Sequence, residues 1–294
     1  MRIVIGVDGS EQGQVGAQLV ATLPLTADDE VVVVSVVPEQ LPVGAWSYVH
    51  VSQVAELSRS AHEAAEASAS AAVEAAATAL AALPCAVRTL LPKGHPAAAL
   101  PEIAREAAAD LVVVGPHGSG RLEELVLGSV AQSLLERMPS SVLVARGPVR
   151  PPTKVLLAYD GSAHSRAAAE FLATLPLPAG AEIQVLTATG GGVELIAPDA
   201  SAIEQLEVGG LKVAREGAEI LEAAGRTATG IVRPGQAKHA IVAAARDLGL
   251  DLVVLGARGL GGVRGLILGS VSRSVSRAAP CSVLVVASRG GAEG

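Results

Sequence analysis

Aromatic residues are nearly absent from this chain of 294 residues, since one Phe, one Trp and two Tyr make up only 1% of it. Proteins that bind single-stranded nucleic acid stack the bases on aromatic side chains. The formal net charge of -7 also differs from the basic footprint that nucleic-acid binders carry. We therefore expect no nucleic-acid partner.

Cysteine and long apolar runs are also scarce. Only Cys85 and Cys281 are present, so a disulfide framework is not expected and a reducing cytoplasm is the expected location. No apolar run is long enough to cross a bilayer. The first predicted strand starts at Arg2 and leaves no room for a signal peptide. We expect a cytoplasmic protein with no membrane partner.

Small and branched apolar residues are what the chain has in abundance. Apolar types make up 50% of it, mostly Ala, Val and Leu, which suits buried parallel strands packed between Ala-rich helices. Predicted strands and helices alternate in the same order twice. The predicted strands are 3–7, 30–37, 86–91, 110–115 and 141–145, then 155–159, 182–188, 227–233, 251–256 and 282–287. The predicted helices are 12–23, 54–83, 97–108 and one after Ser129, then 166–175, 203–224, 237–248 and 271–278.

This alternation predicts an α/β fold made of two tandem doubly wound, Rossmann-like domains. Each domain is expected to be a five-stranded parallel sheet in 3-2-1-4-5 order, with helices on both faces. The predicted domains are residues 1–147 and 153–289. Between them, the proline-rich segment from Arg146 to Pro152 can continue neither element and indicates a short, stiff linker.

Two kinds of motif mark corresponding points in the two copies. Gly115-Pro116-His117-Gly118 is followed after nine residues by Gly128-Ser129, and Gly256-Ala257-Arg258-Gly259 is followed after nine residues by Gly269-Ser270. Asp8-Gly9-Ser10 and Asp160-Gly161-Ser162 follow the first strand of each copy. The Asp motifs are 152 residues apart and the glycine motifs 141, so the first copy carries 11 extra residues, which fall around 38–60.

These positions indicate a phosphate-binding site at the carboxyl ends of the strands. In an open α/β sheet, ligands bind where the strand order reverses, a crevice that Asp8 and Gly115 would border. Glycines let backbone N–H groups approach phosphate oxygens, and Ser129 begins a helix whose first amides are unsatisfied. The carboxylate can accept a hydrogen bond from a ribose hydroxyl or an adenine amino group. Asp160 and Gly256 would border the second crevice.

Each feature alone has a simpler structural explanation. An Asp-Gly-Ser sequence after a strand is commonly a turn with a helix cap, and a Gly at a strand end is commonly a turn. Their occurrence together, in the same order and twice, favours ligand binding. Val36, at the end of the second strand, can form an adenine wall, with a plain core valine as the alternative.

Both copies, across nearly the whole chain, resemble the universal stress protein family. Its ATP-binding members carry G-x2-G-x9-G-(S/T) after the fourth strand and an Asp after the first. The resemblance implies ATP, with or without Mg²⁺, as the cofactor. It also implies that 141–145 and 282–287 pair across a pseudo-twofold axis, which would make the chain an intramolecular pseudo-dimer; a further homodimer stays open. The implied nucleotide contacts are Gly6, Asp8, Val36, Gly115, His117, Gly118, Gly128, Ser129 and Val130, then Ala158, Asp160, Ala188, Gly256, Arg258, Gly259, Gly269, Ser270 and Val271.

The two copies differ in ways that leave open which site is occupied. The first spacer contains Arg121, a further candidate for phosphate contact, together with two glutamates. The second spacer contains Arg264 and no acid, so the second copy suits phosphate better. Against this, Ala158 replaces Gly6 at the end of the first strand, so the second pocket for the base and ribose matches the family pattern less well than the first.

Sequence motifs for catalysis or metal binding are not found. A Walker A loop requires Lys-Ser or Lys-Thr where Arg121-Leu122 stands, and neither G-x-G-x-x-G after the first strand nor G-x-S-x-G occurs. The six His residues lack metal-ligand spacing. We therefore expect no catalytic residue and no metal ligand. The leading hypothesis is a cytoplasmic ATP-binding universal stress protein acting as a nucleotide-responsive regulator. The alternatives are a slow ATP hydrolase on the same fold and an interaction scaffold that binds no nucleotide.

Overall fold

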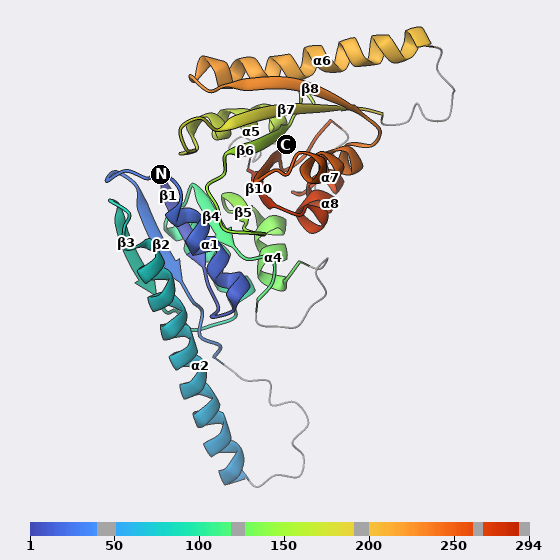
Figure 1. The fold of residues 1–294 in the computed structure, drawn as a ribbon. Coiled ribbons are helices and arrows are strands. Elements are labelled where there is room, and N and C mark those ends of the chain that lie inside the picture. The colour runs from blue at the N-terminus through green and yellow to red at the C-terminus, as the bar shows by residue number, and fades with distance from the viewer. Residues whose placement is uncertain (40–50, 119–126, 191–199, 261–266, 288–294) are drawn as a thin grey trace. The chain divides into compact units, whose positions relative to one another are not determined.

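The computed structural model describes residues 1–39, 51–118, 127–190, 200–260 and 267–287. The chain divides into two compact units (Figure 1). The first contains Met1–Ala21 and Leu25–Pro139, and the second contains Thr22–Pro24 and Ser140–Gly294. Residues 40–50 of the extra segment in the first copy, and Arg121, lie outside the described residues.

The first unit is built on parallel strands in the order β3-β2-β1-β4. Ile5 on β1 is in register with Val33 on β2 and with Val113 on β4, and all three are fully buried. Its elements are β1 (Arg2–Gly6), α1 (Glu11–Ala21), β2 (Glu30–Val34), α2 (Val51–Leu80), β3 (Ala86–Leu90), α3 (Pro96–Glu106), β4 (Leu111–Val114) and α4 (Ser129–Arg137).

The second unit has strands in the order β5-β10-β9-β6-β7-β8, of which β5 alone is antiparallel to its neighbour. Leu143 on β5 lies opposite Leu284 on β10. Its elements are β5 (Ser141–Val144), β6 (Lys154–Ala158), α5 (Ala163–Thr174), β7 (Glu182–Thr189), α6 (Ala200–Ala223), β8 (Ala228–Pro234), α7 (Ala237–Asp247), β9 (Leu252–Gly256), α8 (Ser270–Ala278) and β10 (Ser282–Val286).

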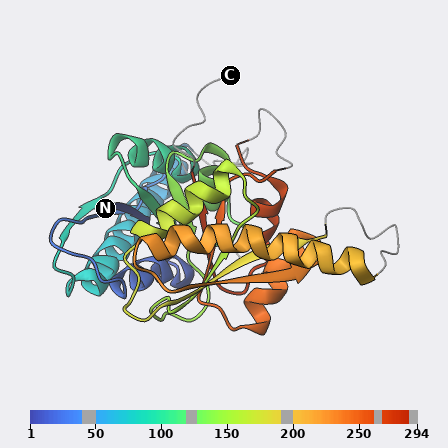
Figure 2. The same ribbon diagram turned by 90° about the horizontal axis from the view of Figure 1, so that it is seen from above.

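The helices of each unit pack in pairs. In the first unit α1 contacts α2 and α3 contacts α4, and in the second α5 contacts α6 and α7 contacts α8. Figure 2 shows α6 lying lengthwise over the strands of the second unit, where it contacts β7 and β8. Short strands of Val, Ile and Leu are therefore buried beneath Ala-rich helices, as the composition predicts.

The predicted α/β fold class and the alternation of strands and helices are confirmed, with element ends displaced by a few residues. The strand order 3-2-1-4-5 is present in the second unit as β8-β7-β6-β9-β10. The sequence repeat assigns 141–145 to the end of the first copy, whereas the compact units place β5 in the second. The reason is the antiparallel pairing of β5 with β10.

Candidate functional site

The turn after β1 places Asp8 at the carboxyl edge of the first sheet. Gly9 adopts a φ of +79°, a left-handed conformation that glycine accepts without steric strain. Asp8 Oδ1 accepts hydrogen bonds from the Ser10 N–H at 3.1 Å and from Ser10 Oγ at 2.6 Å. Ser10 Oγ accepts in turn from the Gly13 N–H at 2.9 Å, so the serine also caps α1. One short turn therefore orients the carboxylate and starts the helix.

The second copy repeats this turn and adds a contact from the glycine loop. The Ser162 N–H donates to Asp160 Oδ1 at 3.0 Å, and the Leu260 N–H donates to Asp160 Oδ2 at 3.0 Å. Burial alone would raise the pKa of Asp160, but hydrogen bonds from Ser162, from Leu260 and from Ser165 outweigh it and hold the pKa below its ordinary value. The Asp160 carboxylate is therefore a charged acceptor with partners from its own chain.

The first glycine of each motif is required by backbone packing. A Cβ on Gly115 would lie 2.5 Å from the carbonyl oxygen of Gln12 in α1, and a Cβ on Gly256 would lie 2.5 Å from the carbonyl oxygen of His164 in α5. A helix backbone cannot swing aside as a flexible side chain can. These glycines therefore let the end of the fourth strand lie against the first turn of the first helix.

The second glycine of each motif lets the loop close on the carboxylate. A Cβ on Gly118 would overlap Asp8 Oδ2, and a Cβ on Gly259 would lie 2.5 Å from Asp160 Oδ2. Neither glycine has a positive φ. The requirement for glycine here is the missing side chain, and it places backbone at the position of closest approach to the Asp.

The third glycine brings the chain back to the same edge and starts a helix. The Gly128 N–H donates to Pro116 O at 2.7 Å, and the Gly269 N–H donates to Ala257 O at 2.7 Å. Neither glycine can supply a side-chain cap, and the first turns of α4 and α8 contain no acidic residue. The positive ends of both helix dipoles therefore lie at the carboxyl edge of their sheets, where they favour an anion.

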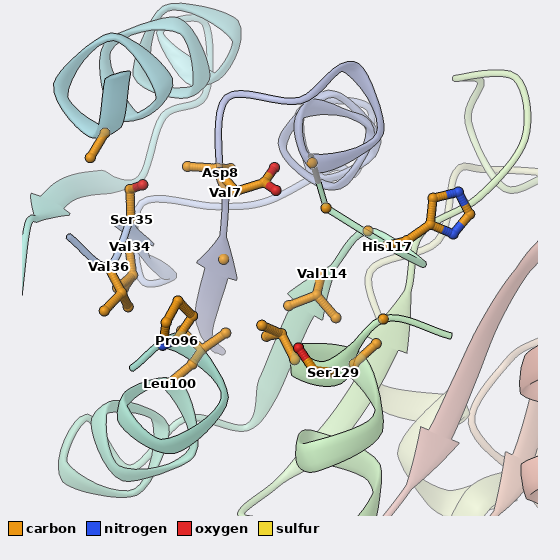
Figure 3. A pocket seen from close by; sticks show the side chains of 18 of the residues that line it. Val7, Asp8, Val34, Ser35, Val36, Pro96, Leu100, Val114, His117 and Ser129 are labelled. Carbon is orange, nitrogen blue, oxygen red and sulfur yellow. The ribbon is translucent and has the colours of Figure 1, made fainter. Parts of the chain in front are cut away.

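A cavity of about 490 Å³ lies in the first unit where these parts meet. Figure 3 shows that Val36, Pro96 and Leu100 gather on one side of it, while Asp8 and Ser129 occupy other parts of its wall. The lining residues are Gly6, Val7, Asp8, Gly13, Val34, Ser35, Val36, Pro38, Ala65, Ser68, Ala69, Pro96, Leu100, Val114, Gly115, His117, Gly118, Gly128, Ser129, Val130 and Ala131. The cavity thus combines an apolar wall with a carboxylate and a glycine-lined helix start.

His117 belongs to this lining, but its ring is directed away from Asp8 (Figure 3). Its Nδ1 atom is buried and has no hydrogen-bond partner among the described residues. His117 therefore presents mainly its backbone to the cavity, next to Gly118.

The corresponding cavity in the second unit is about 100 Å³. Arg258 lines it, and its Nε donates to His164 Nε2 at 2.9 Å. Burial and then the charge of Arg258 lower the pKa of His164, in agreement with a neutral ring that accepts this bond. The lining residues are Ala158, Tyr159, Asp160, Ser165, Leu186, Ala188, Ala237, Ile241, Leu255, Gly256, Arg258, Gly259, Val271 and Ser272.

The structure brings most of the predicted site residues together. Every described candidate of the first copy lines the larger cavity, and Arg121 lies outside the described residues. In the second copy Gly269 and Ser270 are absent from the cavity lining, and the other candidates line it. Contact of these residues with a nucleotide stays a prediction.

Sequence reasoning missed two parts of the larger cavity. Pro96 begins the helix after the third strand and Leu100 lies one turn further along it, at a place that the strand order already puts at the carboxyl edge. Ala65, Ser68 and Ala69 come from α2, where small residues in a long Ala-rich helix give no signal of a ligand wall.

The part of the chain that the structure describes contains no group of three or more His, Cys, Asp or Glu residues arranged to hold a metal ion. Among the described helices, none combines the length and the apolar composition needed to cross a membrane.

Comparisons with known proteins agree with a tandem α/β protein. The model of the universal stress protein family matches residues 1–146 and again residues 152–287. The chain therefore belongs to the universal stress protein family.

Several members of the family are similar over large parts of the chain. A universal stress protein of Mycobacterium tuberculosis is 34% identical over 217 residues, which are 68% of this chain and 68% of that protein. One from Synechocystis is 29% identical over 178 residues, 60% of this chain and 57% of that protein. The crystal structure of a universal stress protein from Archaeoglobus fulgidus matches with a TM-score of 0.67 at 20% identity, covering 97% of this chain and 98% of that one, which supports the fold.

Proposed function

We propose that this universal stress protein binds ATP in its first unit and acts as a nucleotide-responsive regulatory protein. The observation that carries the proposal is the cavity of about 490 Å³, which all described candidates of the first copy line. Its volume falls within the range of about 300–1,000 Å³ that is usual for small-molecule sites. Apolar walls with a few convergent polar groups are also usual in such sites.

Each part of the cavity has a chemical role in this proposal. The apolar side formed by Val36, Pro96 and Leu100 suits an adenine ring. Asp8 accepts a hydrogen bond from a ribose hydroxyl or from the adenine amino group. Backbone N–H groups at Gly118 and at the start of α4 suit phosphate oxygens, because the helix dipole favours negative charge there.

Regulation would follow from binding linkage. The proposed contacts come from β1, the end of β2, α3, the loop after β4 and α4, so a bound nucleotide would hold these elements in one arrangement. A ligand at 100 times its Kd stabilises the binding-competent state by about 2.7 kcal/mol. Such a shift is large enough to change which conformation, and therefore which surface, the protein offers to a partner. We place the protein in the cytoplasm.

Two measurements test nucleotide binding. Nucleotide released from the purified, denatured protein should be adenine nucleotide, and calorimetry with ATP, GTP and NAD should show binding of ATP first. Absence of both co-purified nucleotide and ATP binding at millimolar concentration would refute the proposal and favour the scaffold alternative.

We propose binding, not turnover, as the activity. Phosphoryl transfer relies on positioned cations and an oriented nucleophile, whereas Asp8 lies in the turn after β1, on the side proposed for the ribose. ATP should stay mostly intact over minutes with stoichiometric protein and Mg²⁺. A turnover of about 1 per second, in the ordinary enzyme range, that disappears in Asp8→Ala/Asp160→Ala protein would favour the hydrolase alternative.

A further inference from the structure

The two cavities are built from corresponding positions of the two copies but differ greatly in volume. The first holds about 490 Å³ and the second about 100 Å³. Small-molecule sites usually need about 300 Å³ or more. The second cavity is too small for a nucleoside, although the motifs that surround it are the same.

Larger side chains at the sheet fill part of the second cavity. Leu255 stands where the first copy has Val114, and Ala158 stands where it has Gly6. A Cβ on Gly6 would lie 2.7 Å from a methyl carbon of Leu100, so the glycine leaves room there that an alanine would take. Leu186, which corresponds to Val34 in the first copy, adds a further carbon to the floor.

Two replacements act in the opposite direction without offsetting this filling. Ala188 and Ala237 are smaller than Val36 and Pro96, their counterparts in the first copy. They widen the part of the wall proposed for the base. The second cavity is nevertheless the smaller one, so filling elsewhere outweighs these two replacements.

A serine side chain fills the space next to Asp160 in the second unit. Ser165 is buried, and its counterpart Gly13 has no side chain. Ser165 Oγ accepts from the Asp160 N–H at 3.4 Å and donates to Ser162 O at 3.0 Å. A side chain at Gly13 would instead begin 3.1 Å from Ser10 Oγ and against the Asp8 carboxylate.

The Asp and the arginine of the second unit are engaged by their own chain. Both oxygens of the Asp160 carboxylate accept backbone N–H groups, from Ser162 and Leu260. Arg258 is bonded to His164, which lies in the first turn of α5. A ribose hydroxyl or a phosphate would have to compete with these contacts as well as find room.

We infer that the chain takes up one nucleotide, in the first unit, and that the second unit is a closed copy of the same site. This inference rests on the proposed function and adds its stoichiometry and the residues that decide it. Ser165, Leu255 and the Arg258–His164 pair occupy space and polar groups that the first copy leaves to a ligand, and so keep the second cavity small. The structure thus separates a ligand-binding copy from a copy that contributes only its fold.

Stoichiometry and location can be measured on the unaltered full chain. Calorimetry should give one ATP per chain. Hydrogen exchange with and without ATP should show protection in peptides covering 3–13, 111–118 and 127–135, with unchanged exchange at 155–165 and 252–260. Two ATP per chain, or protection of both sets, overturns the inference while upholding ATP binding, as does protection of the second set alone. No binding at all refutes the proposed function and this inference with it.

A transplanted residue tests the closing mechanism separately. Gly13→Ser places the second copy's serine in α1, a position at which α5 already accommodates Ser165. We expect ATP affinity to fall by about tenfold or more, which corresponds to about 1.4 kcal/mol. Gln18→Ser, at an exposed position of the same helix, is the matched control and should bind as the unaltered protein does. If Gly13→Ser melts normally and binds ATP with unchanged affinity, the serine does not close the site.

Discussion

Replacing Gly118 by alanine isolates the steric role of the glycine loop. Because Gly118 does not have a positive φ, the alanine introduces no backbone strain. Its Cβ would instead overlap Asp8 Oδ2. The carboxylate must then turn away from its hydrogen bonds with the Ser10 N–H and Ser10 Oγ, or the loop must move outward.

The size of the effect follows from what Asp8 gives up. Asp8 is exposed, so we take about 1 kcal/mol for the hydrogen bonding lost within the turn, which is the value for an ordinary hydrogen bond and lies below the range for charged groups. Loss of the proposed hydrogen bond that Asp8 accepts from the ligand costs about 1 kcal/mol of binding free energy. The turn is perturbed with and without ligand, so only the lost contact with the ligand changes the affinity, and about 1 kcal/mol predicts ATP binding weaker by about fivefold. The melting temperature of the free protein should fall by roughly 2–4 °C, because about 1 kcal/mol of hydrogen bonding is lost within the turn.

Calorimetry on Gly118→Ala, Asp8→Ala and a control variant measures this prediction. Gly209→Ala is a suitable control, because a Cβ at this exposed helical position meets nothing within 4 Å. If Gly118→Ala binds ATP within about twofold of the unaltered protein while Asp8→Ala does not bind, the loop can accept a side chain and the reasoning is wrong.

Three further predictions concern the second unit. Burial and the charge of Arg258 lower the pKa of His164 from its ordinary value of about 6.5; the stability linked to it is therefore present above that pH and lost as the pH falls toward the folded-state pKa. An NMR titration should place the midpoint of the His164 ring below about pH 6.5, and a midpoint above that value would contradict the assignment. His164→Gln should reduce the stability that the protein loses in acid. Arg146 donates to carbonyl oxygens at the end of α8, the shortest bond being 2.6 Å. Arg146→Met should therefore lose about 2 kcal/mol of stability, seen as a lower melting temperature, whereas Arg277→Met at an exposed position should not; equal melting of the two variants would count against it. Burial raises the pKa of Cys281 to about 11, so its thiol should resist iodoacetamide at pH 8 until the protein unfolds. Rapid labelling of the folded protein would show that Cys281 is accessible and contradict this prediction.

The sequence predicts the elements well because Val-rich strands and Ala-rich helices alternate without ambiguity. The ends of the elements are harder to predict, because they depend on hydrogen bonds that the periodicity of the sequence does not reveal. The strand predicted to reach Val37 ends at Val34. The residues after Val34 still form hydrogen bonds with the end of β3 and the residues that follow it. The Ser35 N–H donates to Leu90 O, and the Val37 N–H donates to Pro92 O. The pairing thus continues after the regular strand has ended.

The motifs predict the parts of the site that lie on turns, but they do not predict its volume. Asp8 and the three glycines of the first copy lie where the repeat places them. The second copy has equivalent motifs around a much smaller cavity. The cavity's size depends on contacts such as that of Arg258 with His164, which are 94 residues apart and which no motif reveals. The sequence suggested that the second copy suits phosphate better; in the structure its Arg258 is bonded to His164.

The antiparallel pairing of β5 with β10 has a consequence for any attempt to produce the two repeats separately. A polypeptide that begins after the proline-rich linker would present β10, with Val283 and Val285, as an open edge able to pair with other chains and aggregate. One that begins at Ser140 would retain the strand that protects it. In the intact chain that strand is covalently attached, so its effective concentration does not fall on dilution. Fusion of the repeats thus shields this edge at any expression level.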